Sequence, residues 1–252
     1  MRLIATILIF LICHIGYGQS AKKMSGSLLE LPKITAQDNV IIYTGFTVSY
    51  NTSTLIPNWV AYELTSSEVD GQFPRKGQFG QDLSFKGRQA MREDYSNSGW
   101  DKGHMCPAAD LKWSEKTMYE SFYLTNICPQ NHELNSTDWH TLEKLARVWA
   151  KKFDKLYIVC GPIIGDNKYG TIGYNKVFVP DAFFKAFLTV SNGLFHTIAF
   201  VMQNNSQHHR IQDYVLTVND LEKLIGIDLF PNIDDRCEEI VESDIYFKYW
   251  DL

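Results

Sequence analysis

Residues 100–110 read Trp-Asp-Lys-Gly-His-Met-Cys-Pro-Ala-Ala-Asp, and the rest of the chain is best understood as a scaffold that presents this stretch. His104 follows Gly103, which permits a close backbone approach or a positive φ. Pro107 fixes φ and cannot donate to a sheet ladder. An imidazole held on such a bend, beside an acid and a base, suits a general base. The alternative is a buried histidine whose hydrogen bonds are satisfied within a turn.

A second stretch changes the balance between these two interpretations. Residues 121–143 read Ser-Phe-Tyr-Leu-Thr-Asn-Ile-Cys-Pro-Gln, then Asn-His-Glu-Leu-Asn, then Ser-Thr-Asp-Trp-His-Thr-Leu-Glu. Together the two stretches resemble the DNA/RNA non-specific endonucleases of the ββα-metal (His-Me finger) superfamily, which include endonuclease G and secreted bacterial nucleases. That family has Asp-Arg-Gly-His, then Thr/Ser-Asn-x-x-Pro-Gln, then Leu-Asn, Trp and Leu-Glu at fixed offsets. The match continues more weakly from about Tyr62 to Pro231, and ordered elements are more specific than one short motif.

The resemblance implies a fold and a set of roles. The fold would be α+β, with a central, mainly antiparallel sheet flanked by helices and a ββα-metal motif at the active site. His104 would be the general base that takes a proton from water. Asn135 would be the direct ligand of Mg²⁺, with Mn²⁺ as an alternative, and Glu143 would hold the water shell of the metal. Asn126 would orient the site, Arg75 would clamp the phosphate, and cleavage would leave a 5′-phosphate.

Lys102 departs from the family pattern, which usually has arginine at this position. Lysine keeps the positive charge but loses the bidentate fork of a guanidinium, so we expect weaker phosphate affinity or a shifted metal preference. The resemblance implies hydrolysis of both DNA and RNA with little sequence preference. The alternative is a catalytically impaired nucleic-acid-binding protein on the same fold. A homodimer and an inhibitor protein are both compatible with the sequence.

Length and charge agree with a single enzyme domain. The chain has 252 residues, of which 45% are hydrophobic, and this suits one large domain or two small ones. No fixed-period repeat is visible, so we predict one domain. The formal net charge of −5 argues against tight, static binding of nucleic acid. A local basic cleft is sufficient for a transient polyanionic substrate.

The N-terminal residues have the pattern of a targeting segment. Arg2 supplies a positive start, residues 3–15 are almost wholly apolar, and Gly16-Tyr17-Gly18 precedes a cleavage point. The apolar run is too short to anchor the chain in a bilayer, so no stable membrane association is expected. We predict a signal peptide over 1–18, a loosely packed arm over 19–38, a nuclease domain over 39–252, and export to the periplasm or the medium.

Four cysteines follow the predicted signal peptide, namely Cys106, Cys128, Cys160 and Cys237. An even number in an exported chain indicates disulfides, and three pairings are possible. The family brings the segments of His104 and Asn126 together, which favours a 106–128 bridge and leaves 160 with 237. No CxxC spacing is present, so a zinc site is not favoured.

Apolar patterns predict the elements that carry these residues. A helix over 135–153 is indicated by an apolar stripe of Trp139, Leu142, Ala146 and Trp149. Ser114 is expected to cap a short helix, and Gly226 to end a helix that begins near Thr217. The predicted strands cover residues 40–50, with a turn or bulge at Gly45, and residues 59–65, 122–124, 156–160, 177–180, 183–190 and 195–202.

Overall fold

The computed structural model describes residues 28–252, and its central element is a seven-stranded sheet in the order β1-β2-β3-β6-β9-β10-β11. Every neighbouring pair in this sheet is antiparallel. The strands are β1 Val40–Ile42, β2 Thr47–Asn51, β3 Ile56–Thr65, β6 Lys155–Ile163, β9 Ala182–Ser191, β10 Leu194–Gln203 and β11 Val215–Leu216. This arrangement confirms the predicted α+β class with a mainly antiparallel sheet.

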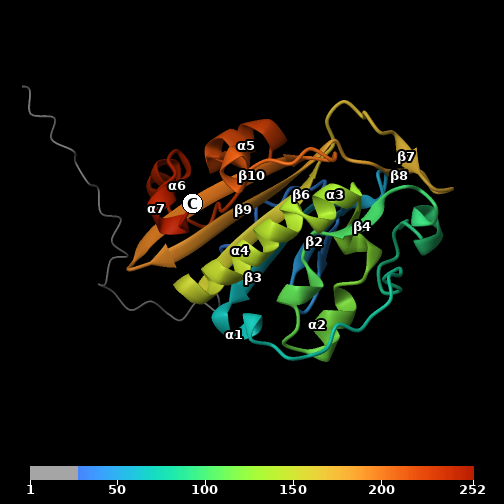
Figure 1. The fold of residues 1–252 in the computed structure, drawn as a ribbon, viewed down its shortest axis with the longest axis horizontal. Helices are drawn as coiled ribbons and strands as arrows, with labels where there is room; N and C mark the ends of the chain where they lie inside the picture. Colours follow the sequence, from blue (N-terminus) through green and yellow to red (C-terminus); the bar gives the residue numbers. More distant parts are fainter. Residues whose placement is uncertain (1–27) are drawn as a thin grey trace, which may run out of the picture.

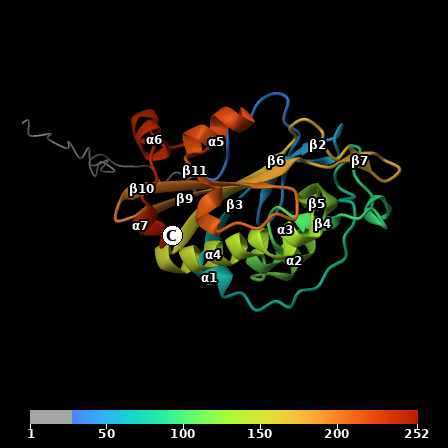
Figure 2. The same cartoon turned by 45° about the horizontal axis from the view of Figure 1, so that its top comes forward.

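Helices cover the two faces of the sheet as separate layers (Figures 1 and 2). The long helix α4 (Asp138–Phe153) packs on one face through its stripe of Trp139, Leu142 and Trp149, which contacts Phe183 and Phe187 of β9. Helices α5 (Val218–Ile225) and α6 (Asp235–Glu242) lie on the opposite face. Because strand side chains alternate between faces, β9 contributes to both layers: Phe183 and Phe187 pack in the core under α4, and Phe184, Ala186 and Leu188 pack in the core under α5 and α6.

A separate two-stranded ribbon lies beside α4 and carries the opening sequence stretch (Figure 1). It pairs β4 (Asp101–His104) with β5 (Ile127–Gln130), so that Gly103 faces Cys128 and His104 faces Ile127. The short helix α3 (His132–Ser136) follows β5 and leads into α4. A ribbon followed by a helix is the ββα arrangement that the resemblance implied.

Glycine at position 103 is required by close packing within this ribbon. A Cβ atom at Gly103 would lie 2.1 Å from Oε1 of Gln130 and 2.6 Å from its Cβ. Close approach to Gln130, and not a positive φ, is therefore the reason why glycine is needed at this position.

The remaining elements are short. They comprise α1 Ser66–Val69, α2 Glu115–Glu120, α7 Phe247–Trp250, the β7–β8 hairpin of Thr171–Ile172 with Val177–Phe178, and 3₁₀ turns at Arg92–Tyr95, Ala108–Asp110, Leu124–Asn126 and Ile211–Tyr214. Ser114 caps α2 by accepting from Thr117 N, and Thr217 caps α5, which ends at Gly226 in the left-handed region. These caps were predicted correctly.

Two predicted elements differ from the structure, and the C-terminal tail contains helices that were not predicted. The helix predicted over 135–153 is broken at Thr137 (φ −120°, ψ −88°), so Asn135 belongs to α3 and Glu143 to α4. The predicted strand at 122–124 is a turn, and the strand begins at Ile127. The C-terminal tail contains α6 and α7, and Trp250 is fully buried against Trp149.

The predicted disulfides are wrong. Cys106, Cys128 and Cys160 are all free, buried thiols, which excludes both the 106–128 and the 160–237 bridge. In the ribbon Cys128 lies opposite Gly103, whereas the backbone of Cys106 bonds to Asn126. The thiol of Cys160 instead donates to the carbonyl of Met105 at 3.2 Å. These thiols are part of the apolar core.

The predicted signal peptide (1–18) and the first part of the predicted arm (19–27) lie outside the described residues. Residues 28–38 contact the domain: Leu29 is buried, and the Lys33 amide donates to the carbonyl of Asp228 at 2.9 Å. The domain boundaries stay a prediction.

Candidate active site

A pocket of about 330 Å³ opens between the β4–β5 ribbon, α3 and α4. It brings together five of the six residues that the sequence singled out, together with His140 and Ser136; the five are Arg75, Lys102, His104, Asn135 and Glu143. Asn126 is not part of the pocket lining. Residues from four separate segments of the chain therefore meet in one cavity.

His104 lies at the end of β4 and is half-buried between two aromatic rings. Its ring centroid is 5.3 Å from that of Phe79 and 5.4 Å from that of Phe122. Burial, and after it the positive charge of Arg75, lower the pKa of His104 to about 4, and the carboxylate of Glu143 opposes this shift. The Nε2 atom is buried and has no hydrogen-bond partner. A neutral imidazole with an unpaired nitrogen can accept a proton at neutral pH.

Asn126 holds the backbone that follows His104. Its Oδ1 accepts from the amide of Cys106 at 2.9 Å, and its Nδ2 donates to the carbonyls of Cys106 (2.8 Å) and Ser121 (3.0 Å). These bonds use both amide hydrogens of a fully buried side chain. Trp139 Nε1 also donates to the carbonyl of His104 at 3.3 Å. Asn126 therefore holds the backbone at Cys106 and is not part of the pocket lining.

A buried ion pair ties the turn after His104 to α4. Asp110, which is 1% exposed, accepts from Nη1 of Arg147 at 2.8 Å and from the hydroxyl of Tyr62 at 3.1 Å. Burial raises the pKa of Asp110 to about 6, and Arg147 opposes this rise. The pair joins the Pro107 turn to both α4 and β3 and so restrains the geometry of the pocket.

Two cations face the cavity from different segments. The guanidinium carbon of Arg75 lies 5.3 Å from the centroid of Phe122, and Nζ of Lys102 lies 5.7 Å from the centroid of Phe79. The loop that carries Arg75 packs closely against Phe122: a Cβ atom added at Gly77 would lie only 2.3 Å from that ring. Aromatic contacts of this kind hold the cations over the site without neutralising them.

Asn135 on α3 and Glu143 on α4 supply oxygen atoms to the same pocket. Nδ2 of Asn135 donates to Oδ2 of Asp101 at 2.9 Å, which orients the amide and leaves Oδ1 available. Glu143 is 9% exposed, and its Oε2 lies 3.6 Å from Nδ1 of His140. An amide oxygen and a carboxylate are hard donors that suit a largely hydrated Mg²⁺. Among residues 28–252 no group of three or more His, Cys, Asp or Glu forms a closed metal cage.

Sequence reasoning missed two members of this site. Asp101 orients Asn135 and also lies 2.9 Å from Nδ1 of His132. Its place at the head of the Asp-x-Gly-His motif was the available signal. His140 lines the pocket and sits three residues before Glu143, on the same side of α4.

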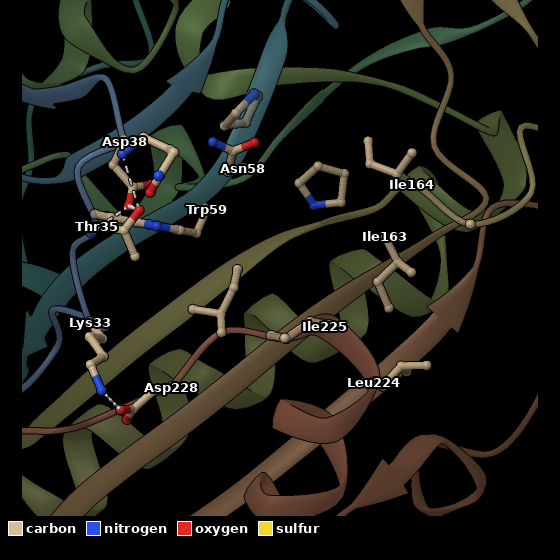
Figure 3. A pocket seen from close by; sticks show the side chains of 16 residues that line it. Lys33, Thr35, Asp38, Asn58, Trp59, Ile163, Ile164, Leu224, Ile225 and Asp228 are labelled. Atoms are coloured by element: carbon tan, nitrogen blue, oxygen red, sulfur yellow. Dashed lines mark hydrogen bonds and ion pairs between the residues drawn. The ribbon is translucent and has the colours of Figure 1, made fainter.

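A larger cavity, of about 670 Å³, lies elsewhere in the molecule (Figure 3). It is lined by residues 33–38, 57–59, 162–165 and 224–228. Its charged groups are already paired, since Lys33 contacts Asp228 at 3.2 Å and Asp38 accepts from Thr35 at 2.8 Å. The smaller pocket is therefore the candidate active site, because it contains the buried Nε2 of His104 without a hydrogen-bond partner and the cations Arg75 and Lys102.

Comparison with known proteins shows to which family the chain belongs. A family model described as DNA/RNA non-specific endonuclease matches residues 28–236. The chain belongs to the DNA/RNA non-specific endonuclease family. It is 36% identical over 235 residues to the mitochondrial nuclease EXOG of Danio rerio, covering 87% of this chain and 68% of that protein. It is 31% identical over 206 residues to human mitochondrial endonuclease G, covering 76% and 69% of the two chains.

A solved structure shares the fold of this endonuclease. The match is to a crystal structure of an EndoG/EndoGI complex that concerns EndoG inhibition, with a TM-score of 0.76 and 29% identity. The alignment covers 82% of this chain and 90% of that one. The chain is therefore a nuclease, a hydrolase that acts on nucleic acids, as the sequence predicted.

The predicted export is wrong by the same comparison. The EXOG and endonuclease G relatives are named as mitochondrial proteins, which overturns the expectation of a periplasmic or extracellular enzyme. Within residues 28–252 no helix has the length and apolar character needed to cross a bilayer.

Proposed function

We propose that this nuclease is a metal-dependent endonuclease that hydrolyses the phosphodiester bonds of both DNA and RNA and leaves 5′-phosphate ends. The observation that carries the proposal is the buried, unpartnered Nε2 of His104 in a pocket that also contains two cations and two oxygen donors. Phosphodiester hydrolysis needs an activated water and neutralisation of charge that develops on the phosphate. Each requirement has a candidate group in this pocket.

His104 is the general base in this proposal. Its lowered pKa, about 4, keeps the imidazole neutral at physiological pH, so Nε2 can accept the proton of an attacking water. Trp139 donates to the carbonyl of His104 itself, and Asn126 holds the backbone of Cys106, two residues later. A fixed base removes the cost of orienting the reacting groups at each turnover.

Arg75 and Lys102 bind the scissile phosphate. Arg75 can present a guanidinium fork to two phosphate oxygens, whereas Lys102 offers a compact point charge. Both cations line the same pocket as His104 and Asn135, so they can stabilise the negative charge that develops on the phosphate in the transition state. Contacts of this kind read the phosphate and not the base, which supports action on DNA and RNA alike.

Asn135 and Glu143 would hold Mg²⁺, with Mn²⁺ as an alternative. The donor set fits, because Oδ1 of Asn135 is turned away from Asp101 and the Glu143 carboxylate faces the same pocket. The metal, when bound, would supply Lewis acidity at the phosphate and a water for the leaving oxygen. Asp101 fixes the amide, and Glu143 would act on the water shell of the metal.

Protein partners follow from the same relatives. The solved complex pairs EndoG with EndoGI, so an inhibitor protein that covers the pocket is a reasonable partner for this enzyme too. A homodimer stays a prediction.

Degradation of plasmid DNA and of RNA by the purified protein tests the proposal. We expect both substrates to be cut with Mg²⁺ and neither with EDTA, and the products to carry 5′-phosphates that a phosphatase removes. Asn135→Ala should require more Mg²⁺ than the wild type. If DNA and RNA both bind to the protein but neither is cut with Mg²⁺ or Mn²⁺, the alternative of a catalytically impaired nucleic-acid-binding protein replaces the proposal. Lys102→Arg then tests whether the lysine at this position causes the loss of cleavage.

A further inference from the structure

A lysine side chain is buried in the core between the sheet and α4. Lys185 lies on β9 at the alternate position between Phe183 and Phe187, so it points with them toward α4 (Figure 1). The side chain is fully buried. Burial of an ammonium group is costly unless its partners compensate for the lost water. Lys185 does not line the active-site pocket, so a contact with the substrate does not explain it.

The ammonium group of Lys185 reaches the chain directly behind the base. Its Nζ donates to the carbonyl of Met105, the first residue after β4, at 3.4 Å. Cys160, which lies opposite Lys185 in the β6–β9 ladder, donates its thiol to the same carbonyl at 3.2 Å. A carbonyl oxygen has two lone pairs, so it can accept both bonds. A cross-strand pair of the sheet therefore holds the chain where it leaves His104.

A second contact of the same ammonium group leads to His104 itself. Nζ of Lys185 lies 4.5 Å from the centroid of the Trp139 ring, and both side chains are buried, so water does not weaken this cation–π contact. Nε1 of the indole donates to the carbonyl of His104 at 3.3 Å. Lys185 thus acts, directly or through one indole ring, on the carbonyls of two consecutive residues, His104 and Met105.

The charge of Lys185 has no direct counterion. In the described part of the chain no carboxylate forms an ion pair with it. Asp110 acts on it from a distance: burial raises the pKa of Asp110 to about 6, and the charges of Arg147 and then of Lys185 oppose this rise. A buried cation compensated in this way reduces stability, and such a cost is common where function requires the group.

We propose that Lys185 is a positioning residue for catalysis, which holds the Met105 carbonyl and the Trp139 indole and thereby fixes the His104 imidazole in the pocket. The inference rests on the proposed function, since His104 is the base of that reaction. Lys185 contacts neither the phosphate nor the metal in this arrangement. It therefore affects the rate of the chemical step, while binding of the substrate depends on the two cations of the pocket.

Replacement of Lys185 by methionine separates positioning from stability. Methionine fills a similar volume without the charge, so the Tm of Lys185→Met should equal or exceed that of the wild type. In plasmid cleavage with Mg²⁺, kcat should fall at least ~10-fold with little change in KM, because the base is no longer held. The matched control is Thr189→Val on the same face of β9, which removes a buried hydroxyl that donates to the carbonyl of Lys155 at 2.8 Å. Its Tm should fall and its kcat should stay unchanged.

Hydrogen exchange of the segment after His104 measures the same contacts without catalysis. The amides of Met105 and Cys106, which bond to Asn126, should exchange about 10-fold faster in Lys185→Met than in the wild type. The inference is overturned if the variant keeps the wild-type exchange rate and kcat, or if it does not fold, since Lys185 would then serve stability alone. A wild-type protein that cleaves neither DNA nor RNA rejects the proposed function, and the exchange rates then decide whether Lys185 holds this segment.

Discussion

Replacement of Asn126 by alanine tests whether the backbone clamp behind His104 is needed for catalysis. The substitution removes the three hydrogen bonds between the Asn126 side chain and the backbone of Cys106 and Ser121. At about 1 kcal/mol each, their loss lowers the free energy of unfolding by about 3 kcal/mol. For a chain of this size that corresponds to a decrease in Tm of about 6–12 °C. Because Cys106 lies two residues after His104, the base also loses its fixed position.

The assay combines denaturant unfolding with steady-state cleavage of DNA well below the Tm of the variant. We expect kcat to fall at least ~10-fold, since misplacement of a catalytic group by about 1 Å costs up to ~10²-fold. KM should change little, because Arg75 and Lys102 are unaltered. The matched control is Leu221→Ala on the opposite face of the sheet, where a fully buried leucine should lose about 2–5 kcal/mol without change in kcat. If both variants are equally destabilised and Asn126→Ala keeps the wild-type kcat, the positioning role is refuted.

Three further predictions concern the metal ligand, the base and the thiols. Asp101→Ala frees the amide of Asn135 and should raise the Mg²⁺ concentration needed for half-maximal activity about 10- to 100-fold; an unchanged Mg²⁺ titration would argue against this orienting contact. In the proposed mechanism activity requires unprotonated His104, whose pKa is about 4. The rate should therefore persist as pH falls from 7 to about 5 and drop only near pH 4. An acidic limb centred near pH 6.5 in a pH–rate profile would contradict the buried environment of the imidazole. Burial raises the pKa of the Cys106 and Cys128 thiols, so Ellman's reagent should modify them only after unfolding, and rapid labelling of the native protein would show that they are accessible.

Patterns over a few neighbouring residues correctly predicted those elements that are determined by neighbouring residues alone. The stripe of Trp139, Leu142 and Trp149 identified α4, and Thr217 and Gly226 identified the two ends of α5. Gly103 was expected to allow close approach or positive φ, and the ribbon shows that close approach is the reason. These features depend on periodicity, capping and sterics over a few residues.

Features set by tertiary packing could not be predicted in the same way. The break at Thr137 lies in a polar segment before the apolar stripe, which begins at Trp139, so periodicity did not reveal it; the separate helix α3 places Asn135 within 2.9 Å of Asp101. The cysteine pairing was wrong because strand register, which sequence spacing does not determine, places Cys128 opposite Gly103. The sequence likewise identified five residues that the pocket brings together, but spacing did not show that Asn126, expected to orient the site, would lie outside the pocket with its amide bonded to the backbone of Cys106 and Ser121.

The central claim is that the fold presents His104 as the base, and plasmid nicking by His104→Ala beside the wild type tests it most directly. His196→Ala, which replaces another half-buried histidine outside the pocket, controls for the loss of an imidazole. We predict that His104→Ala loses at least ~10²-fold in nicking rate with Mg²⁺, as expected for a lost general base, while His196→Ala stays within about 3-fold of the wild type. A folded His104→Ala protein that nicks plasmid at the wild-type rate would contradict the account.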